Sequence, residues 1–183
     1  MKVNTSRFGL IEVADSDIIG FSEGLLGFEG SKKFFIVDPA DETLIMWLQS
    51  LDSPQIAFPI LEPKLFKADY KVRLSANELR TLKIDSAKDK ETLVYCILTI
   101  PEDVAQISAN LKAPVVINTN CSVGRQVVLQ ENEYSVKFPV YKDLMAVLVA
   151  ASSSQSGIEK AESAGVSAFS LKGAVSAVEV SGL

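Results

Sequence analysis

The chain of 183 residues contains no histidine. Histidine is the side chain whose ordinary pKa best suits proton transfer near neutral pH, and it is a frequent metal ligand. Its absence excludes Ser-His-Asp and Cys-His catalytic arrangements and histidine-ligated zinc sites. Carboxylate, lysine and tyrosine chemistry stay open, but most enzyme classes lose their usual acid–base group. The absence of histidine therefore disfavours most enzyme classes, and we expect no cofactor.

Cysteine is scarce as well, with Cys96 and Cys121 as the two examples. They form no CxxC pair, and neither stands at a metal-ligand spacing. Cys96 lies in the apolar run TLVYCILTI, where a buried thiol behaves as a small hydrophobic side chain. A nucleophilic Cys121, with Arg125 favouring its thiolate, is the enzymatic alternative. It has no histidine base, and full activity of a Cys121→Ser variant would exclude it.

Long apolar runs and an excess of basic residues are also missing. No segment reaches the roughly 20 apolar residues of a membrane span, and the N-terminal segment lacks the apolar core of a signal peptide. We therefore expect a cytoplasmic protein without a membrane partner. The formal net charge is −5, which repels a phosphate backbone, so direct nucleic-acid binding is not expected. An acidic surface instead favours encounter with a basic protein.

The first 140 residues consist of short apolar segments separated by turn residues. Near-regular spacing of such segments is typical of an all-β barrel or sandwich. One short helix is expected in LSANELRTLKI, where Ser75 and Glu78 are spaced as in a capping box. A hairpin is expected in VNTSRFGLIEV, with its turn near Arg7 to Gly9, and the long run ETLVYCILTI is expected to be the central strand. The other expected strands lie in DIIGF, KKFFIVD, TLIMWLQSL, IAFPIL, APVVIN, GRQVVLQ and YSVKFPV.

The segment SEGLLGFEGS places Gly24, Gly27 and Gly30 at intervals of three. Such spacing predicts a winding loop in which positive φ angles are needed. A phosphate-binding loop is the alternative, but it requires a lysine and a Ser or Thr in the P-loop arrangement. Neither follows here, so the winding loop is the preferred interpretation.

The composition changes towards the C-terminus, and we divide the chain into a β-barrel domain at 1–142 and an extension at 143–183. The extension is expected to begin as a short helix in YKDLMAVLVAA and to continue as a flexible tail. From Ser152 onwards Ser, Ala and Gly make up more than half of the residues. Such a tail buries too little apolar area to offset the entropy of ordering. A docking segment that folds on a partner is the alternative.

Six segments occur in a characteristic order and spacing: TSRFGLIEV, IIGFSEGLLGFEGSKKFFIVD, MWLQSLDSPQIAFPILEP, TIPED, NLKAPVVIN and GRQVVLQENEYSVKFPV. Together they resemble the flagellar assembly factor FliW family over about residues 5–140. The glycine-bearing family motif matches FSEGLLGFE, and a second motif matches Leu48 to Asp52 with Ala57 to Ile60. Six matches in order make the resemblance specific.

The resemblance implies a small, β-barrel-like, non-enzymatic protein of the bacterial cytoplasm. Family members bind flagellin, and they bind and antagonise CsrA, a dimeric RNA-binding repressor of flagellin translation. The two partners exclude each other, so accumulated flagellin captures the factor and frees CsrA to stop translation. For this chain the resemblance implies flagellin and CsrA as partners of a protein that is monomeric when free. A flagellin-specific chaperone without CsrA regulation is the alternative.

Two ligands that exclude each other require a shared surface or a bistable element. Strand edges are candidates for a shared surface, and Pro59 in AFPI indicates an edge or a bulge beside Phe58. In NLKAPVVIN, asparagine side chains could pair with the backbone of an added strand, which makes this stretch a candidate recognition edge. The competing interpretation places Phe58 and the Val-Val-Ile run in the core. The candidate residues of the second stretch are Asn110, Leu111, Pro114, Ile117 and Asn118.

Acidic residues form a further candidate group. Glu102 and Asp103, together with Glu62 and Asp69, are expected to steer a basic partner, which affects the association rate more than the affinity. A nucleic-acid-binding alternative treats the barrel as OB-like, with Phe34, Phe35 and Tyr95 as stacking platforms. Salt-sensitive binding of RNA by the purified chain would support that alternative.

Overall fold

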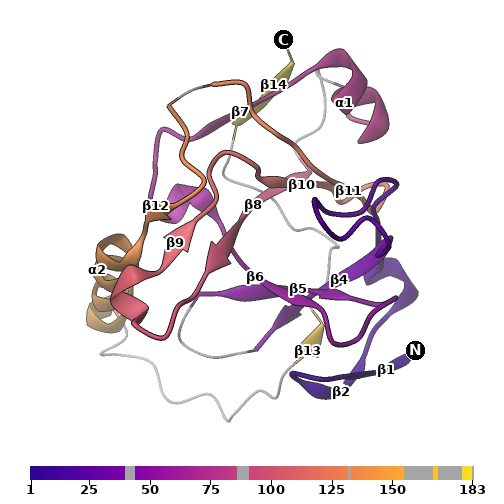
Figure 1. Ribbon diagram of the computed structural model, residues 1–183, viewed down its shortest axis with the longest axis horizontal. Helices are drawn as coiled ribbons and strands as arrows, with labels where there is room; N and C mark the ends of the chain where they lie inside the picture. Colours follow the sequence, from indigo (N-terminus) through magenta and orange to yellow (C-terminus); the bar gives the residue numbers. More distant parts are fainter. Residues whose placement is uncertain (40–43, 86–90, 132, 155–166, 169–178, 183) are drawn as a thin grey trace.

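The structure is a computed structural model that describes residues 1–39, 44–85, 91–131, 133–154, 167–168 and 179–182. Within these residues, seven strands close a ring in the order β10-β11-β3-β4-β5-β6-β8, and β8 pairs with β10 to complete it (Figure 1). The predicted all-β barrel is therefore confirmed. The strands of the ring are β3 (Ile19–Gly20), β4 (Lys33–Asp38), β5 (Met46–Ser50), β6 (Ala57–Leu61), β8 (Thr92–Thr99), β10 (Val115–Asn118) and β11 (Val123–Gln126).

One junction of the ring differs from the others. Strands β11 and β3 form a single parallel pair, Val123 with Gly20, whereas the remaining neighbours in the ring are antiparallel. A backbone hydrogen bond from Gly20 N to Ser122 O (2.8 Å) supports this junction. Beyond the ring, the end of β8 pairs antiparallel with β9 (Ser108–Ala109), and β9 pairs with β12 (Phe138–Pro139).

The interior of the barrel is filled by alternate residues of its strands. Because successive side chains of a strand point to opposite faces, Phe34 and Ile36 of β4 and Val115 and Ile117 of β10 lie inside. These four side chains are fully buried. The other members of the interior cluster are Ile19, Phe21, Leu25, Leu48, Ile60, Leu93 and Tyr95.

The outer face of the barrel is also covered on two sides, which explains why KFFIVD reads as a continuous apolar run. Phe35 and Val37 of β4 pack under the hairpin of β1 (Lys2–Thr5) and β2 (Gly9–Glu12). On another side, Val94 and Cys96 of β8 pack with β7 (Lys71–Leu74) and with residues that follow β11, and we call this cluster the outer core. A strand buried on both faces shows no alternation of polar and apolar residues.

Three local predictions are confirmed. The expected β1–β2 hairpin forms, and its turn at residues 6–8 lies one residue before the expected Arg7 to Gly9. Helix α1 (Ala76–Thr81) begins with the predicted capping box, in which Ser75 Oγ accepts from Glu78 N (3.4 Å) and Glu78 Oε2 accepts from Ser75 N (2.7 Å). Strand β8 pairs with β6, β9 and β10 and is the central strand, as ETLVYCILTI indicated.

The expected strand in GRQVVLQ is shorter than predicted, because β11 ends at Gln126. The chain still runs beside the segment that precedes β10, since Val127 N donates to Pro114 O and Leu129 N donates to Lys112 O (2.9 Å each). Val127 and Leu129 are buried, whereas Val128 is exposed. The side chains of residues 127–129 thus alternate between buried and exposed as in a strand, although these residues form no regular β-ladder.

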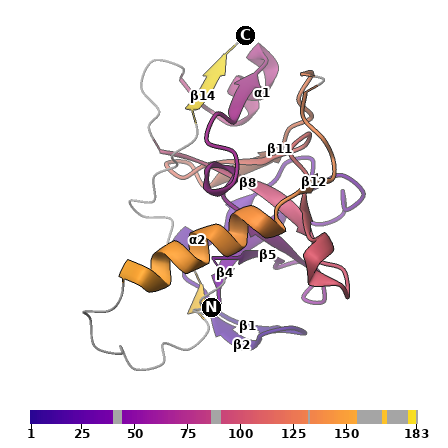
Figure 2. The same cartoon turned by 90° about the vertical axis from the view of Figure 1, so that its left-hand side faces the viewer.

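Helix α2 (Tyr141–Ser154) crosses one side of the molecule (Figure 2), where Leu144 is buried against the outer core. It begins two residues before the boundary that we drew at 142/143. Two described segments of the extension are strands: β13 (Ser167–Ala168) pairs with β4, and β14 (Glu179–Gly182) pairs with β7. The remaining residues of the expected flexible tail lie outside the described part of the chain.

Candidate functional site

The predicted recognition edge at NLKAPVVIN does not exist as an edge. Strand β10 pairs with β8 on one side and with β11 on the other over all four of its residues. Its backbone groups are therefore committed to the barrel and cannot receive an added strand. The prediction was wrong because a β-branched run fits a central strand as well as an edge.

The side chains of this stretch also serve the fold. Leu111, Pro114 and Ile117 are buried, and the Leu111 carbonyl accepts a hydrogen bond from the Tyr70 hydroxyl (2.7 Å). Asn110 is half-buried, and its Oδ1 accepts from Ala113 N (3.0 Å), which closes a local turn. Asn110 is thus the one member of the group that reaches the surface.

Asn118 is buried and bonded to the end of helix α1. Its Nδ2 donates to Leu82 O (3.0 Å) and Lys83 O (3.1 Å), and its Oδ1 accepts from Asn120 N (3.0 Å). The last carbonyls of a helix have no partner within the helix. Asn118 supplies that partner, so its role is to fasten α1 to the barrel.

We expect Asn118→Ala to lower the free energy of unfolding by about 2 kcal/mol, because buried carbonyls would lose their donors. Urea unfolding followed by circular dichroism measures the change. Asn4→Ala, at an exposed position of β1, is the matched control and is expected to have little effect. Equal midpoints for the two variants would contradict the structural role of Asn118.

Phe58 and Pro59 occupy a more open position. Strand β6 pairs with β8 through Ile60 and Leu61, and no pairing of Ala57–Pro59 on that side is present in the described residues. Proline cannot donate to a ladder, which explains why the pairing ends there. Phe58 and Pro59 are both half-buried.

An exposed aromatic side chain lies beside Phe58. The ring of Phe28, which is 40% exposed, packs edge-to-face on Phe58 with centroids 4.8 Å apart. Leu26, two residues earlier, is 56% exposed. We call the segment SEGLLGFEGS, residues 22–31, the glycine loop. It carries large apolar side chains to the surface, where they lie beside Phe58. We call Leu26, Phe28 and Phe58 the loop surface.

The glycine loop is wound from three successive turns, as its glycine spacing predicted. Backbone hydrogen bonds run from Gly24 N to Phe21 O (3.2 Å), from Phe28 N to Leu25 O (2.8 Å) and from Ser31 N to Phe28 O (3.0 Å). Gly24 and Gly27 have φ angles of 74° and 80°. Only glycine adopts such angles without steric cost.

Buried anchors and hydrogen bonds hold the loop on the barrel. The Phe21 ring lies so close to Gly124 that a Cβ there would sit 2.4 Å from its Cζ, and Leu25 is buried in the interior cluster. Gln126 Oε1 accepts from Leu26 N (3.0 Å). The loop is thus attached to the barrel on its inner side, while Leu26 and Phe28 face outwards.

Ionic contacts add to this attachment. Arg125 Nη1 lies 2.6 Å from Glu23 Oε1, which joins β11 to the loop. Within the loop, Glu29 Oε1 accepts from Gly27 N (2.8 Å), and this backbone hydrogen bond lowers the pKa of Glu29. These contacts attach the loop surface to the barrel, and such preorganisation reduces the entropic cost of binding.

The four acidic candidates do not form one cluster in the sequence: Glu102 and Asp103 follow β8, whereas Glu62 and Asp69 lie between β6 and β7. Glu102 and Asp103 are exposed, and Asp103 caps the short helix η3 (Val104–Gln106) by accepting from Ala105 N (3.1 Å). Ile100 and Val104, on either side of them, are exposed apolar residues. Asp69 is exposed and paired with Lys67 (2.7 Å), and this hydrogen bond lowers the pKa of Asp69. Glu62 is half-buried at the end of β6.

Sequence reasoning missed Leu26, Phe28, Ile100 and Val104. The available signal was a large apolar side chain in a segment of turn residues, as for Phe28 between Gly27 and Gly30. Such a residue has no strand periodicity that would turn it inwards.

A family model described as FliW protein matches residues 2–140. The chain belongs to the FliW family. It is 42% identical over 149 residues to the flagellar assembly factor FliW of Bdellovibrio bacteriovorus, covering 81% of this chain and 84% of that protein. It is 36% identical over 145 residues to the flagellar assembly factor FliW of Thermoanaerobacter pseudethanolicus, covering 79% of this chain and 95% of that one.

A solved structure supports the same assignment. The crystal structure of a flagellar assembly factor FliW matches with a TM-score of 0.70 and 34% identity, covering 76% of this chain and 96% of that chain. The family model ends at residue 140, so helix α2 and strands β13 and β14 lie beyond it.

The two cysteines of this FliW-family chain differ in exposure. Cys96 is buried in the outer core, and burial raises the pKa of its thiol to about 12. Cys121 is exposed in the β10–β11 turn. In the described residues no group of three or more Cys, Asp or Glu side chains is arranged to hold a metal ion.

We expect one of the two thiols to react quickly with a disulfide reagent at pH 8 in the native protein. The thiolate is the reactive species, and burial suppresses it at Cys96. Absorbance of the released chromophore measures the number of thiols that have reacted, and this number should rise to two in denaturant. A Cys121→Ser variant should show no fast thiol, whereas two fast thiols in the native chain would contradict the burial of Cys96.

The aromatic residues of the nucleic-acid alternative are not available for stacking. Phe34 and Phe35 are fully buried and Tyr95 is 4% exposed, so the proposed platform does not exist. Stacking on a base requires an open ring face. No helix among the described residues has the length and apolar character needed to cross a bilayer.

Proposed function

We propose that this chain is a cytoplasmic flagellar assembly factor that binds flagellin and antagonises the translational repressor CsrA by partner switching. The observation that carries the proposal is membership of the FliW family over residues 2–140, with relatives that are named flagellar assembly factors. Flagellin that accumulates would capture the factor, and CsrA would then be free to stop flagellin translation. Export of flagellin would reverse the exchange.

The surface of the domain suits a protein-binding role. Leu26 and Phe28 are large apolar side chains held rigidly in contact with water, and aromatic anchors of this kind dominate binding energies at protein interfaces. We assign the shared contact to the loop surface together with Pro59. Mutual exclusion then requires no conformational change, because two partners cannot occupy one aromatic anchor.

Charge supports the choice of a basic partner. The formal net charge of −5 and the exposed Glu102 and Asp103 favour encounter with a protein that binds RNA through basic groups. We assign these two residues to steering of the association rate. Asn110 is the remaining candidate of the earlier set that a partner can reach, whereas the buried members belong to the barrel.

Calorimetry tests the proposal. The purified full-length chain, monomeric by sedimentation, is titrated with CsrA in the absence and in the presence of saturating flagellin. Binding of CsrA that flagellin abolishes is the expected result. Binding of flagellin alone would leave a flagellin-specific chaperone, which is the second candidate function. Binding of neither protein would overturn both.

A further inference from the structure

Strand β7 lies outside the barrel ring and has two different faces. Val72 and Leu74 are fully buried in the outer core, whereas Lys71 and Arg73 are exposed. The strand is thus held in an extended conformation by its apolar face. Its charged face is exposed to solvent.

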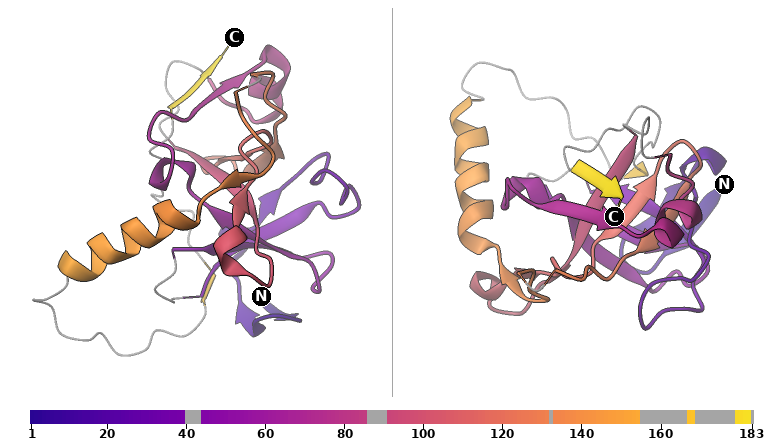
Figure 3. Two further views of the ribbon diagram at one scale, coloured as in Figure 1. Left: turned by 60° about the vertical axis from the view of Figure 1, so that its left-hand side comes forward. Right: turned by 90° about the horizontal axis from the view of Figure 1, so that it is seen from above.

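The backbone edge of β7 is covered by the C-terminal segment of the same chain. Strand β14 pairs with β7 in parallel, with Glu179 opposite Lys71, Val180 opposite Val72, Ser181 opposite Arg73 and Gly182 opposite Leu74. Figure 3 shows the two strands side by side at the end of the molecule that carries the C-terminus. Among the described residues, β14 is the one strand that pairs with β7.

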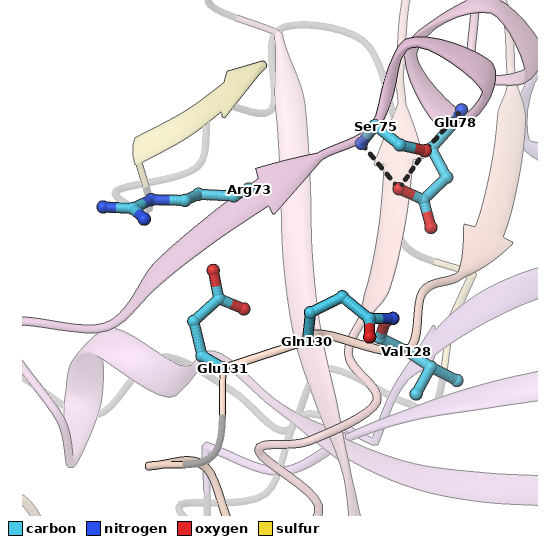
Figure 4. Close-up of a pocket in the computed structure, with 6 residues that line it drawn as sticks. All are labelled: Arg73, Ser75, Glu78, Val128, Gln130 and Glu131. Carbon is cyan, nitrogen blue, oxygen red and sulfur yellow. Dashed lines mark hydrogen bonds between the residues drawn. The ribbon is translucent and has the colours of Figure 1, made fainter. Parts of the chain in front are cut away.

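The sequence of β14 matches the chemistry of the edge. An acidic residue stands opposite Lys71, and a β-branched apolar residue stands opposite Val72. Arg73, the next exposed residue of β7, lines a pocket of about 320 Å³ with groups from residues 128–131 (Figure 4).

The pairing of β14 with β7 has two features that favour its displacement. It spans four residues and is parallel, and parallel pairs are slightly less stable per residue than antiparallel ones. Strand β14 also lies beyond the part of the chain that the family model matches. An extended peptide that adds to a sheet edge gains main-chain hydrogen bonds of the same kind.

We propose that the edge of β7 is a strand-addition site for an extended segment of a partner protein with an acidic residue followed by an apolar one, and that Glu179–Gly182 occupies this site as a displaceable internal strand. An unpaired edge is a site for unwanted association, so the internal strand protects it until a partner arrives. This inference goes beyond the proposed function, because it does not depend on the identity of the partner that the loop surface binds.

A labelled peptide with the sequence of residues 176–183 tests the proposal by fluorescence anisotropy. The released variant carries Val180→Pro and Ser181→Pro, which remove the backbone donors of β14 whichever of the two faces β7. The matched control carries Ser167→Pro and Ala168→Pro, which disturb β13 and leave β14 intact. We expect the peptide to bind the released variant at least about tenfold more tightly than the wild type or the control, because a tethered competitor acts at a high effective concentration.

A charge exchange tests the register. Lys71→Glu in the released variant should weaken peptide binding about two- to fivefold, and a peptide with lysine in place of Glu179 should restore it, since opposite charges on paired strands attract. Lys2→Glu, an exposed position on β1, changes the net charge equally and should leave the affinity unchanged. Weakening without restoration by the exchanged peptide would contradict the pairing.

Hydrogen exchange of full-length protein supplies an independent measurement. The Lys71 amide donates to the Tyr134 hydroxyl (3.2 Å), so the amides that face β14 are those of Val72 and Leu74. These two amides should exchange faster in the released variant than in the wild type, and added peptide should slow them again. Glu179→Lys, which places like charges opposite each other, gives a second released form without proline. Equal peptide affinity of wild-type and released forms, or no binding to either, or unchanged exchange at β7, would overturn the proposal.

Discussion

Replacing Gly24 with alanine is expected to lower the free energy of unfolding by about 3 kcal/mol or more, because two costs add. The φ angle of 74° lies in the left-handed region, which an L-residue adopts at a cost of about 1–2 kcal/mol. A Cβ at this position would also lie 2.8 Å from Glu29 Cα and Phe28 O and 2.9 Å from Ser31 O. These are backbone atoms of the same loop, so the clash cannot be relieved by a side-chain rotation.

Gly27→Ala is the matched control for this prediction. Gly27 has a similar φ angle of 80°, but no atom lies within 4 Å of its Cβ position. Gly27→Ala should therefore lower the free energy of unfolding only by the cost of the left-handed backbone conformation, about 1–2 kcal/mol. Urea midpoints of both variants measure the difference. Equal destabilisation would mean that the close approach at Gly24 relaxes without cost, and the winding of the loop would then be less constrained than its three turns indicate.

Phe28→Ser is expected to weaken partner binding about 30-fold or more while leaving the fold intact, since aromatic hot spots contribute 2 kcal/mol or more. Phe28 is 40% exposed and packs on Phe58, so its removal opens no closed core. Calorimetry against flagellin and against CsrA measures the change for each partner. Leu10→Ser, at a side chain that is 66% exposed on β2, is the control for a generic loss of surface apolarity.

The pattern of losses distinguishes the forms of the partner switch. Weakening of both partners by Phe28→Ser would support one shared anchor. Weaker binding of only one partner would mean that the other partner binds a different surface. Ile100 and Val104, beside Glu102, would be the next surface to test. Normal binding of both partners would remove the loop surface from the proposal, although the wild-type titrations would still decide the function.

Local signals in the sequence predicted local structure well. The capping box at Ser75 and Glu78 predicted α1 because all of its hydrogen bonds lie within four residues. The glycines of the loop predicted its turns for the same reason. The apolar run around Phe34 and Phe35 predicted a strand, but it could not show that one ring faces the barrel interior and the other faces the β1–β2 hairpin.

The errors concerned partners that are distant in the sequence. The stretch NLKAPVVIN was interpreted as an edge because nothing within it reveals that β8 and β11 flank it. Asn118 was interpreted as a recognition residue because its true partners, the carbonyls of Leu82 and Lys83, belong to another element. Phe28 was overlooked because its exposure results from the winding of the loop around Gly24 and not from any periodic pattern.

The parallel junction of β3 and β11 has a consequence for the order of folding. Strands β3 to β6 are neighbours in sequence and in the ring, so they can pair early as hairpins. The junction of Gly20 with Val123 joins distant segments through one residue pair, and its formation must overcome the entropy of closing a long loop. It is therefore expected to close last on refolding and to open first under stress. The glycine loop follows β3 directly, so opening of the β3–β11 junction would move the loop surface before the core is disturbed.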